Sequence, residues 1–385
     1  MQVLSVEEQR LIHRTIREFA RETLRSQAAA WDRENRFPTE LIPRLADLGL
    51  FGMTIPADYG GSGLPATAVA TAIEALAWGD GGIALSVAAH NSLCAGHLVA
   101  FANETQRRRF LPRLATGEAL GSWCLTEPGA GSDAAGIQTR AERRGDQWVL
   151  NGTKVFVTNG SLAGIYVVMA VTTPGAGRSG ITAFVVERGT PGLEIGKKED
   201  KLGVRSSDTA EVRFADCAVP DECRIGEVGS GYQQAMRVLE RGRIGIAAMA
   251  VGIGRAALDA SLEYAQQRQA YGRPIADLQA IQFMLADMAT ELDAAWLLTE
   301  HAAALADRGE PFRRESSMAK LYAAEAAARA AARAVQIHGG YGFIKDYPVE
   351  RYYRDIKLCE IGEGTSEVQR AIISRAVLES LGGAR

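Results

Sequence analysis

The chain has 385 residues, 47% of them hydrophobic and 23% charged, so it can bury a sizeable core, and a disordered or fibrous protein is excluded. Single cores stop growing near ~250–300 residues, which predicts two or three domains. The formal net charge is −3 with both signs spread along the chain, so no basic face indicates nucleic acid and no charged tail indicates a membrane surface.

The beginning of the chain has the periodicity of helices. Ser5 and Glu8 match a capping box, in which each side chain bonds the other residue's backbone at a helix start. Apolar residues then follow at the spacing of one helix face: Leu11, Ile12, Ile16, Phe19 and Leu24. Helical periodicity resumes over residues 41–48 and 67–114. We therefore predict an all-α domain over residues 1–120.

A change of pattern near residue 121 predicts a β domain. Residues 148–150 and 155–158 flank Asn151-Gly152, which is typical of a two-residue type I′ turn, so we predict a hairpin at this point. Further β-branched or aromatic runs, bounded by Gly and Pro, occupy residues 165–171, 181–186 and 210–214. We predict an antiparallel β domain over residues 121–230.

Helical segments rich in alanine and leucine return in the last third of the chain. They occupy residues 232–268, 278–307, 314–338 and 366–381. Four long helices predict a four-helix bundle over residues 231–385. The predicted fold class is therefore multidomain α+β, with a sheet domain between two helical domains. Because cofactors are commonly held where domains meet, this order of domains itself indicates a ligand site.

Cysteine usage and apolar stretches indicate the compartment. The five cysteines are odd in number and lack the paired spacing of a zinc site or a disulfide scaffold. Residues 1–19 lack the uninterrupted apolar core of a signal peptide. The most apolar stretch, residues 83–100, is interrupted by His90, Asn91 and His97, which predicts a buried helix. We predict reduced thiols, a cytoplasmic protein and no membrane insertion.

Two patterns imitate cofactor or metal sites. Gly252-Ile-Gly254 begins a dinucleotide-binding glycine pattern, but that pattern needs a preceding strand, and here it lies within a helical run. We interpret these small residues as sites of close helix packing. The five histidines lack metal-ligand spacing such as HExxH, so we predict no metal site.

Two segments of the central region suit a flat ligand. Residues 123–133 (WCLTEPGAGSD) concentrate an aromatic ring, hydroxyls and glycines, which let a backbone approach and bond a ligand. The alternative is a Pro-Gly turn that enters a strand. Phe156 and Thr158 share one face of a strand, opposite Val157. A ring beside a hydroxyl can cover a flat cofactor, although ordinary sheet residues show the same pattern.

Glu363 lies between Gly362 and Gly364, just before a helix whose start matches a cap formed by Ser366 and Gln369. One interpretation is a charge that stabilises a helix N-terminus. The functional interpretation is a carboxylate that can approach a substrate carbon closely, because the glycines on either side of Glu363 have no side chains.

Together and in this order, these segments resemble the acyl-CoA dehydrogenase family over nearly the whole chain. The motifs that carry the resemblance are LTEPGAGSD (125–133), NGTK (151–154), KLGVR (201–205), QIHGG (336–340), RD (354–355) and GEGTSE (362–367). Short-chain and bacterial members look nearest, especially through residues 242–246. The resemblance implies FAD in a cleft between three domains, a homotetramer, and electron-transferring flavoprotein as the electron acceptor.

The resemblance also implies site residues, position by position. FAD contacts are expected at Trp123, Cys124, Leu125, Thr126, Gly131, Ser132, Phe156, Val157, Thr158, Arg268, Tyr271, Gln279, Gln336, Gly339, Gly340, Thr365 and Glu367. Within this set, Arg268, Gln279 and residues 336–340 match positions that bind the FAD of a neighbouring subunit. Substrate contacts are expected at Ser132, Glu240, Arg243, Gly362 and Gly364.

Family members place their catalytic base at one of two points. One is the glutamate of the Glu-Gly-Thr-Ser motif, here Glu363; the other lies immediately before the arginine that matches Arg243, where this chain has Gly242. Glu240 is two residues too early to replace it. The resemblance therefore implies that Glu363 removes the α-proton of an acyl-CoA thioester while flavin N5 accepts the β-hydrogen as hydride. An oxygen-using acyl-CoA oxidase and a flavoprotein that binds acyl-CoA without turnover remain as alternatives.

The residue before the base bears on the substrate. Many straight-chain members carry tyrosine where this chain has Gly362, and isovaleryl-CoA dehydrogenases have glycine there. Removing the ring opens space beside the α and β carbons, so we predict an acyl chain of about four to six carbons with methyl branches tolerated. The pathway stays open between fatty acid β-oxidation and branched-chain amino acid catabolism. The alternative interpretation is that Gly362 only shapes the loop that holds Glu363.

Overall fold

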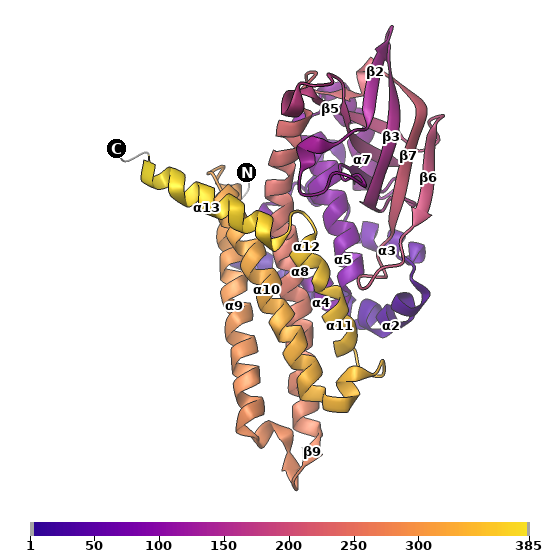
Figure 1. Cartoon of the computed structure of the whole chain (residues 1–385). Coiled ribbons are helices and arrows are strands. Elements are labelled where there is room, and N and C mark those ends of the chain that lie inside the picture. The colour runs from indigo at the N-terminus through magenta and orange to yellow at the C-terminus, as the bar shows by residue number, and fades with distance from the viewer. Residues whose placement is uncertain (1–3, 383–385) are drawn as a thin grey trace.

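The structure is a computed structural model that describes residues 4–382, and Figure 1 shows helices, then a sheet, then helices along the chain. The N-terminal region contains α1 (Val6–Phe19), η1 (Ala20–Leu24, a π-helical turn), α2 (Arg25–Glu34), α3 (Ile42–Asp47), α4 (Ala66–Gly79), α5 (Gly81–Ala88), η4 (Ala89–Ala95, also π-helical), α6 (Gly96–Phe101) and α7 (Glu104–Ala115). The predicted helical region is therefore confirmed.

The first helix begins with the predicted capping box. The Ser5 hydroxyl accepts a hydrogen bond from the Glu8 backbone N–H at 3.2 Å, and Glu8 Oε2 accepts one from the Ser5 N–H at 2.7 Å. Of the apolar residues with helical spacing, Ile16 and Phe19 are buried, whereas Leu11 is 51% exposed. Each residue turns the helix by about 100°, which places position 11 outside the narrow stripe that faces the core.

The central region forms one sheet with the strand order β6-β7-β3-β2-β4-β5-β8, and β1 lies beside β4. The strands are β1 (Gly121–Cys124), β2 (Arg140–Arg144), β3 (Gln147–Thr158), β4 (Ile165–Val171), β5 (Ile181–Glu187), β6 (Leu193–Lys198), β7 (Thr209–Pro220) and β8 (Arg224–Ile225). Most pairings are antiparallel, as predicted, and β4 pairs in parallel with β1 and β2.

The predicted hairpin at Asn151-Gly152 is wrong. The two-residue connection lies instead at Gly145-Asp146, between the paired residues Arg144 and Gln147. Asn151 and Gly152 lie inside β3, where the register against β7 shifts. A Cβ on Gly152 would lie 2.5 Å from Thr139 Oγ1, so glycine here permits a close approach of two chain segments rather than a turn.

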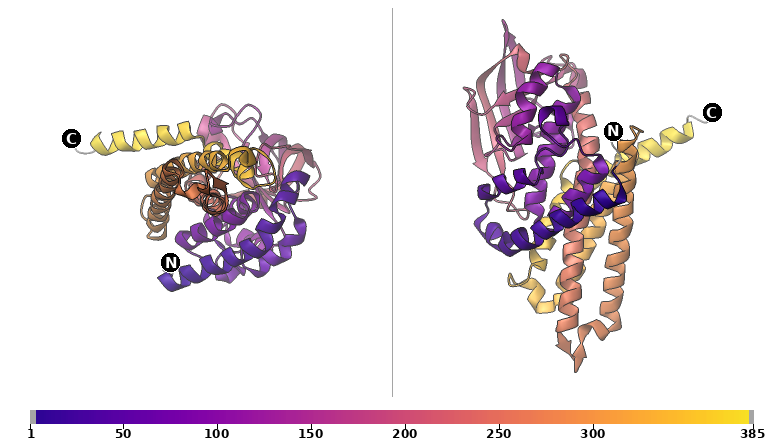
Figure 2. Two further views of the ribbon diagram at one scale, coloured as in Figure 1. Left: turned by 90° about the horizontal axis from the view of Figure 1, so that it is seen from below. Right: turned by 180° about the vertical axis from the view of Figure 1, so that it is seen from behind.

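The C-terminal region contains α8 (Gly231–Gln267), α9 (Gln279–Asp307), α10 (Arg313–His338), α11 (Val349–Asp355), α12 (Lys357–Ile361) and α13 (Ser366–Gly382), with a small hairpin of β9 (Gln269–Ala270) and β10 (Arg273–Pro274). The four long helices match their predicted ranges closely, whereas α11 and α12 were not predicted. Figures 1 and 2 show α8, α9 and α10 side by side and α13 projecting away from them. The N-terminal helices lie against α8 and beside the sheet.

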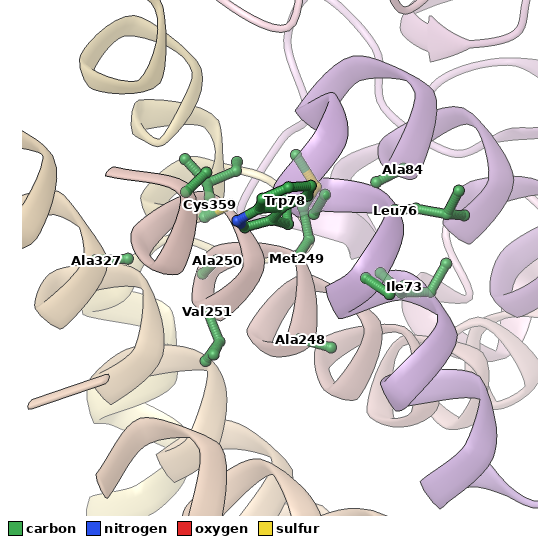
Figure 3. Packing of buried hydrophobic residues seen from close by; sticks show 14 of the residues in the cluster. Ile73, Leu76, Trp78, Ala84, Ala248, Met249, Ala250, Val251, Ala327 and Cys359 are labelled. Atoms are coloured by element: carbon green, nitrogen blue, oxygen red, sulfur yellow. The ribbon is translucent and has the colours of Figure 1, made fainter. Parts of the chain in front are cut away.

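The main core lies where α4 and α5 meet α8, as Figure 3 shows with Ile73, Leu76 and Met249. Gly252 permits the close contact, because a Cβ there would lie 2.3 Å from the Glu74 carbonyl oxygen. A Cβ on Gly254 would lie 2.4 Å from a methyl carbon of Leu292 on α9. The interpretation of these glycines as sites of helix packing is confirmed.

Two helical stretches, Gly81–Phe101 and Gly231–Gln267, have the length and composition of membrane spans. Their apolar windows are 72% and 83% buried inside the protein, which is the behaviour of core helices. All five cysteines are free and buried. Within residues 4–382, no group of three or more His, Cys, Asp or Glu side chains is placed to hold a metal ion.

Candidate active site

The loop between α12 and α13 carries Glu363 in an unusual backbone conformation. Gly362 has φ −64° and ψ 148°, which any residue adopts. Glu363 and Gly364 then have positive φ values of 55° and 98°. A left-handed conformation at a residue other than glycine persists only where surrounding contacts impose it, and such residues gather at functional sites.

The side chain of Glu363 lies directly against the backbone of α8. A Cβ built on Gly242 would lie 2.0 Å from Glu363 Oε2 and 3.2 Å from its Oε1. Glycine at position 242 therefore makes room for the carboxylate. The two positions at which the resemblance implies a base, 363 and 242, are therefore next to each other in this structure.

The environment of Glu363 suits proton transfer. Its Oε2 is buried and has no hydrogen-bond partner among the described residues. Burial raises the pKa of Glu363 to about 7, and the charges of Arg243 and Lys320 oppose this rise. A carboxylate whose pKa lies near neutrality can both take and release a proton under ordinary conditions.

The predicted substrate contacts on α8 lie beside this loop. Arg243 is buried, and its guanidinium lies 3.5 Å from the Ser317 hydroxyl of α10. Glu240 lies one turn earlier on α8, 3.8 Å from Arg313, and burial raises its pKa. Ser132, by contrast, is exposed on the loop that follows β1.

The start of α13 differs from the prediction in one detail. Thr365, not Ser366, occupies the cap position, since its hydroxyl accepts a hydrogen bond from the Val368 N–H at 3.3 Å. Ser366 is already the first helical residue, which makes the predicted cap wrong by one position. Glu367 is exposed on the first turn.

A second group of predicted residues lies along β1 and β3. Trp123, Thr126 and Thr158 are partly exposed, and Phe156 is 65% exposed with a positive φ of 56°. The side chains of Cys124, Leu125 and Val157 are buried in the sheet, so only their backbone can face a ligand. Gly131, also in the predicted set, has open space on the side where a Cβ would lie.

Lys154 supports the loop after β1 and was missed as a functional residue, although it ends the NGTK motif. Its side chain is fully buried, and its Nζ donates to the Leu125 carbonyl at 3.1 Å and to Glu127 Oε1 at 2.7 Å. The Val155 N–H donates to the Thr126 carbonyl at 2.9 Å. These bonds hold Thr126 from both sides.

A third group surrounds a pocket of about 470 Å³ at the far end of α8. Its walls include Arg268, Gly339 and Gly340 from the predicted set, His338 from the predicted run 336–340, and Tyr264 and Tyr341, which were not predicted. The Tyr264 and His338 rings stack at 4.2 Å. Tyr271, Gln279 and Gln336 are exposed at the same end of the helices.

The second group fits a flavin ring and the third fits an adenine end. The exposed ring of Phe156 offers a flat apolar face, and the partly exposed Thr158 two residues further along β3 carries a hydrogen-bonding hydroxyl. Open space at Gly129 and Gly131 admits a phosphate chain close to the backbone. Aromatic rings and an arginine around the distant pocket suit a purine.

The chain places a helical domain, a sheet domain and a second helical domain in this order, and comparison with known families assigns that arrangement to a class of flavin-dependent oxidoreductases. Three family models match the chain: the N-terminal, middle and C-terminal domains of acyl-CoA dehydrogenase, over residues 6–118, 122–217 and 229–378. The chain therefore belongs to the acyl-CoA dehydrogenase family, whose members are FAD-dependent enzymes acting on CH–CH bonds.

Individual relatives cover almost the full chain. An acyl-CoA dehydrogenase of Bacillus subtilis (strain 168) is 45% identical over 97% of this chain and 98% of its own length. The mitochondrial short-chain specific acyl-CoA dehydrogenase of Rattus norvegicus is 44% identical over 97% of this chain and 91% of its own. The structure of butyryl-CoA dehydrogenase from Megasphaera elsdenii has a TM-score of 0.95 at 42% identity, covering 98% of this chain and 100% of its own.

Proposed function

We propose that this acyl-CoA dehydrogenase converts a short-chain acyl-CoA to its trans-2-enoyl-CoA, with Glu363 as the base that removes the α-proton. An α-proton of a thioester is weakly acidic, so its removal needs a positioned base and a donor for the developing oxyanion. The backbone N–H of Glu363 is the proposed donor from this chain. Bound FAD supplies the acceptor for the β-hydrogen, which leaves as hydride.

The position of Glu363 over Gly242 is the observation that carries this proposal. The carboxylate projects from a held loop against a glycine, its Oε2 is buried, and burial raises its pKa to about 7. Glu240, the other carboxylate near Arg243, lies 3.8 Å from Arg313 and so has a charged partner. An unpaired carboxylate is better suited to accept a proton than a paired one.

Glu363→Gln tests the base. The change is nearly isosteric, so we expect FAD content to match wild type while bleaching of the flavin by butyryl-CoA slows by at least ~10²–10⁴-fold. Glu360→Gln is the matched control, since Glu360 lies three residues away on α12 and pairs with Lys357 at the surface. Fast bleaching by the Glu363 variant would move the base elsewhere, with Glu240 the next residue to test.

Substrate choice follows from the residue beside the base. Gly362 has a backbone conformation open to any residue, and a Cβ there would lie 3.4 Å from the Leu358 carbonyl oxygen, close to ordinary contact. The backbone therefore does not require glycine, which supports the steric interpretation over a loop-shaping one. We propose acyl chains of about four to six carbons, branched ones included.

A substrate series in wild type and Gly362→Tyr tests this choice. We expect butyryl- and isovaleryl-CoA to exceed octanoyl-CoA in kcat/KM for wild type, and the tyrosine to lower branched-chain turnover by about 10-fold or more. Octanoyl-CoA as the best substrate, or a tyrosine without effect on branched chains, would contradict the steric argument.

We propose a homotetramer in which the pocket near Arg268 receives the adenine end of a neighbour's FAD. Positions 243 and 268 are 25 residues apart, about 38 Å along α8 at 1.5 Å per residue. Glu363, which contacts α8 at Gly242, and the distant pocket are therefore too far apart in one chain to share one end of a cofactor. Exposed apolar side chains such as Phe283, Leu297 and Leu378 support burial against further copies. Mass measurement of the holoenzyme tests the tetramer.

We propose electron-transferring flavoprotein as the acceptor and the cytoplasm as the location. A structure described as electron transferring flavoprotein of Acidaminococcus fermentans matches with a TM-score of 0.96 at 42% identity, and the five free, buried thiols suit a reducing compartment.

An oxidase is the second candidate, because the prolyl acyl carrier protein oxidase AnaB matches with a TM-score of 0.93 at 33% identity. Reduced enzyme mixed with air separates the two: peroxide formed at the rate of turnover would favour the oxidase, and slow peroxide formation with fast transfer to the flavoprotein would favour the dehydrogenase.

A further inference from the structure

Lys320 of α10 is a buried cation outside every predicted flavin and substrate contact. Its side chain is fully buried, and its Nζ donates a hydrogen bond to the Gly364 carbonyl at 2.6 Å. Burying an ammonium group is unfavourable unless it is paired and bonded. The bond joins α10 to the loop that follows Glu363, which is 43 residues further along the chain.

A second donor reaches the same loop from α13. The buried Gln369 amide donates to the Gly364 carbonyl at 2.9 Å and to the Glu363 carbonyl at 3.3 Å. Glu363 and Gly364 are the two residues with positive φ. A left-handed residue other than glycine needs compensation from its surroundings, and these donors supply it by fixing the orientation of both peptide groups.

The charge of Lys320 also faces the base. Arg243 of α8 and Lys320 are the two buried cations near Glu363. The other titratable groups around them are Glu240 of α8, Arg313 of α10, and Cys359 and Glu360 of α12. Burial lowers the pKa of Lys320 to about 8, so it is mostly protonated at pH 7. Its positive charge lowers the pKa of Glu363 against the effect of burial.

We propose that Lys320 is a positioning residue for the reaction: it holds the Gly364 carbonyl so that the Glu363 carboxylate stays over Gly242, and its charge favours the ionised carboxylate. This proposal rests on the proposed role of Glu363 as the base. Lys320 touches neither substrate nor reacting atoms, so its effect reaches the chemistry through the loop.

The test compares Lys320→Met with Lys357→Met in FAD-loaded enzyme. Lys357 lies on the exposed side of α12 and pairs with Glu360, so its removal changes net charge equally without touching the loop. The readout is the rate of flavin bleaching by butyryl-CoA across pH 5.5–9. A small displacement of a reacting group reduces rates by up to ~10²-fold, so we expect Lys320→Met to slow bleaching about 10- to 100-fold.

The pH profile separates positioning from general damage. Loss of the cation raises the pKa of the carboxyl, so the midpoint of the rising limb should move up by about one pH unit in Lys320→Met and stay in place in Lys357→Met. KM for butyryl-CoA should change less than the rate. A wild-type rate, an unmoved midpoint, or a rate loss that disappears when corrected for FAD content would each overturn the proposal.

Two further variants test the same proposal if Lys320→Met does not fold. Lys320→Arg keeps the charge and should keep the midpoint while lowering the rate, because a guanidinium places its donors differently. Gln369→Leu removes a neutral donor and should lower the rate about 10-fold without moving the midpoint. Wild-type rates in both variants would overturn the proposal. Bleaching retained in Glu363→Gln would instead refute the proposed base, independently of Lys320.

Discussion

Two glutamates of this protein have buried carboxylate oxygens in opposite surroundings. Glu74 of α4 has both oxygens bound: Oε2 lies 3.0 Å from His13 Nε2, and Oε1 lies 3.1 Å from Arg255 and 3.5 Å from Arg17. Glu363 has a buried Oε2 with no hydrogen-bond partner in the part of the chain that the structure describes.

Burial of the carboxylate therefore has opposite outcomes at the two sites, where Glu74 is fully buried and Glu363 is partly buried. At Glu74 burial favours a higher pKa, but the hydrogen bond with His13 and the charges of Arg255 and Arg17 outweigh it and lower the pKa. At Glu363 two cations without direct contacts leave the pKa at about 7. The number of bonded partners, rather than burial, decides whether a carboxylate stabilises the fold or stays available for chemistry.

Glu74→Gln should have the largest effect on stability. It removes the negative partner of two arginines in a buried site, and breaking such a group typically lowers the free energy of unfolding by ~3–5 kcal/mol. Thermal unfolding of the FAD-loaded enzyme measures this loss, and kcat per bound FAD should stay near wild type. A loss below ~1 kcal/mol would show that the cluster contributes little.

Glu363→Gln should change stability in the other direction. Because the pKa in the folded protein, about 7, lies above the ordinary 4.5, the stability that neutral Glu363 provides is complete below about pH 4.5 and is lost as pH rises through 7. Glutamine stays neutral, so we expect the variant to be more stable at pH 8 by about 2–3 kcal/mol and equal to wild type near pH 4. Melting temperatures at the two pH values check the sign; a variant less stable at pH 8 contradicts it.

His13→Ala should have the smallest effect of the three. His13 is 39% exposed and contributes one contact to Glu74, while both arginines remain. We expect a loss of about 1 kcal/mol in the free energy of unfolding. If this loss equalled that of Glu74→Gln, His13 rather than the arginines would hold the cluster together.

Sequence patterns predicted those helices and caps well whose formation depends mainly on residues close together in the chain. The Ser5–Glu8 capping box and the ranges of the four long C-terminal helices depend on neighbouring residues, and both are confirmed. The turn predicted at Asn151-Gly152 was wrong because Gly152 is needed for close contact with Thr139, which lies in another segment. The local sequence pattern contains no information on that contact. The short helices α11 and α12 lack the length that makes periodicity detectable.

The residues of the candidate site likewise fall into those that a sequence motif indicates and those that only the folded structure reveals. Glu363 was singled out through its motif and Gln369 as a cap residue, but Lys320 carries no local signal, and the bonds of Lys320 and Gln369 to the loop carbonyls were not predicted. The importance of Gly242 likewise rests on a contact 121 positions away in sequence. Motifs thus single out the proposed base, while the residues that bond its loop become visible only when the helices are packed together.

The close approach of Gly242 to Glu363 also has an evolutionary consequence. Since a Cβ at position 242 would lie 2.0 Å from the carboxylate, a glutamate gained there while Glu363 remains would force two side chains into one space. With Glu363 as the proposed base, a lineage that moved the base to position 242 would therefore pass through an enzyme with no base or with two glutamates that collide. Loss of the loop glutamate to a small residue is the less disruptive first step, because it leaves the fold intact and the space empty for the second substitution.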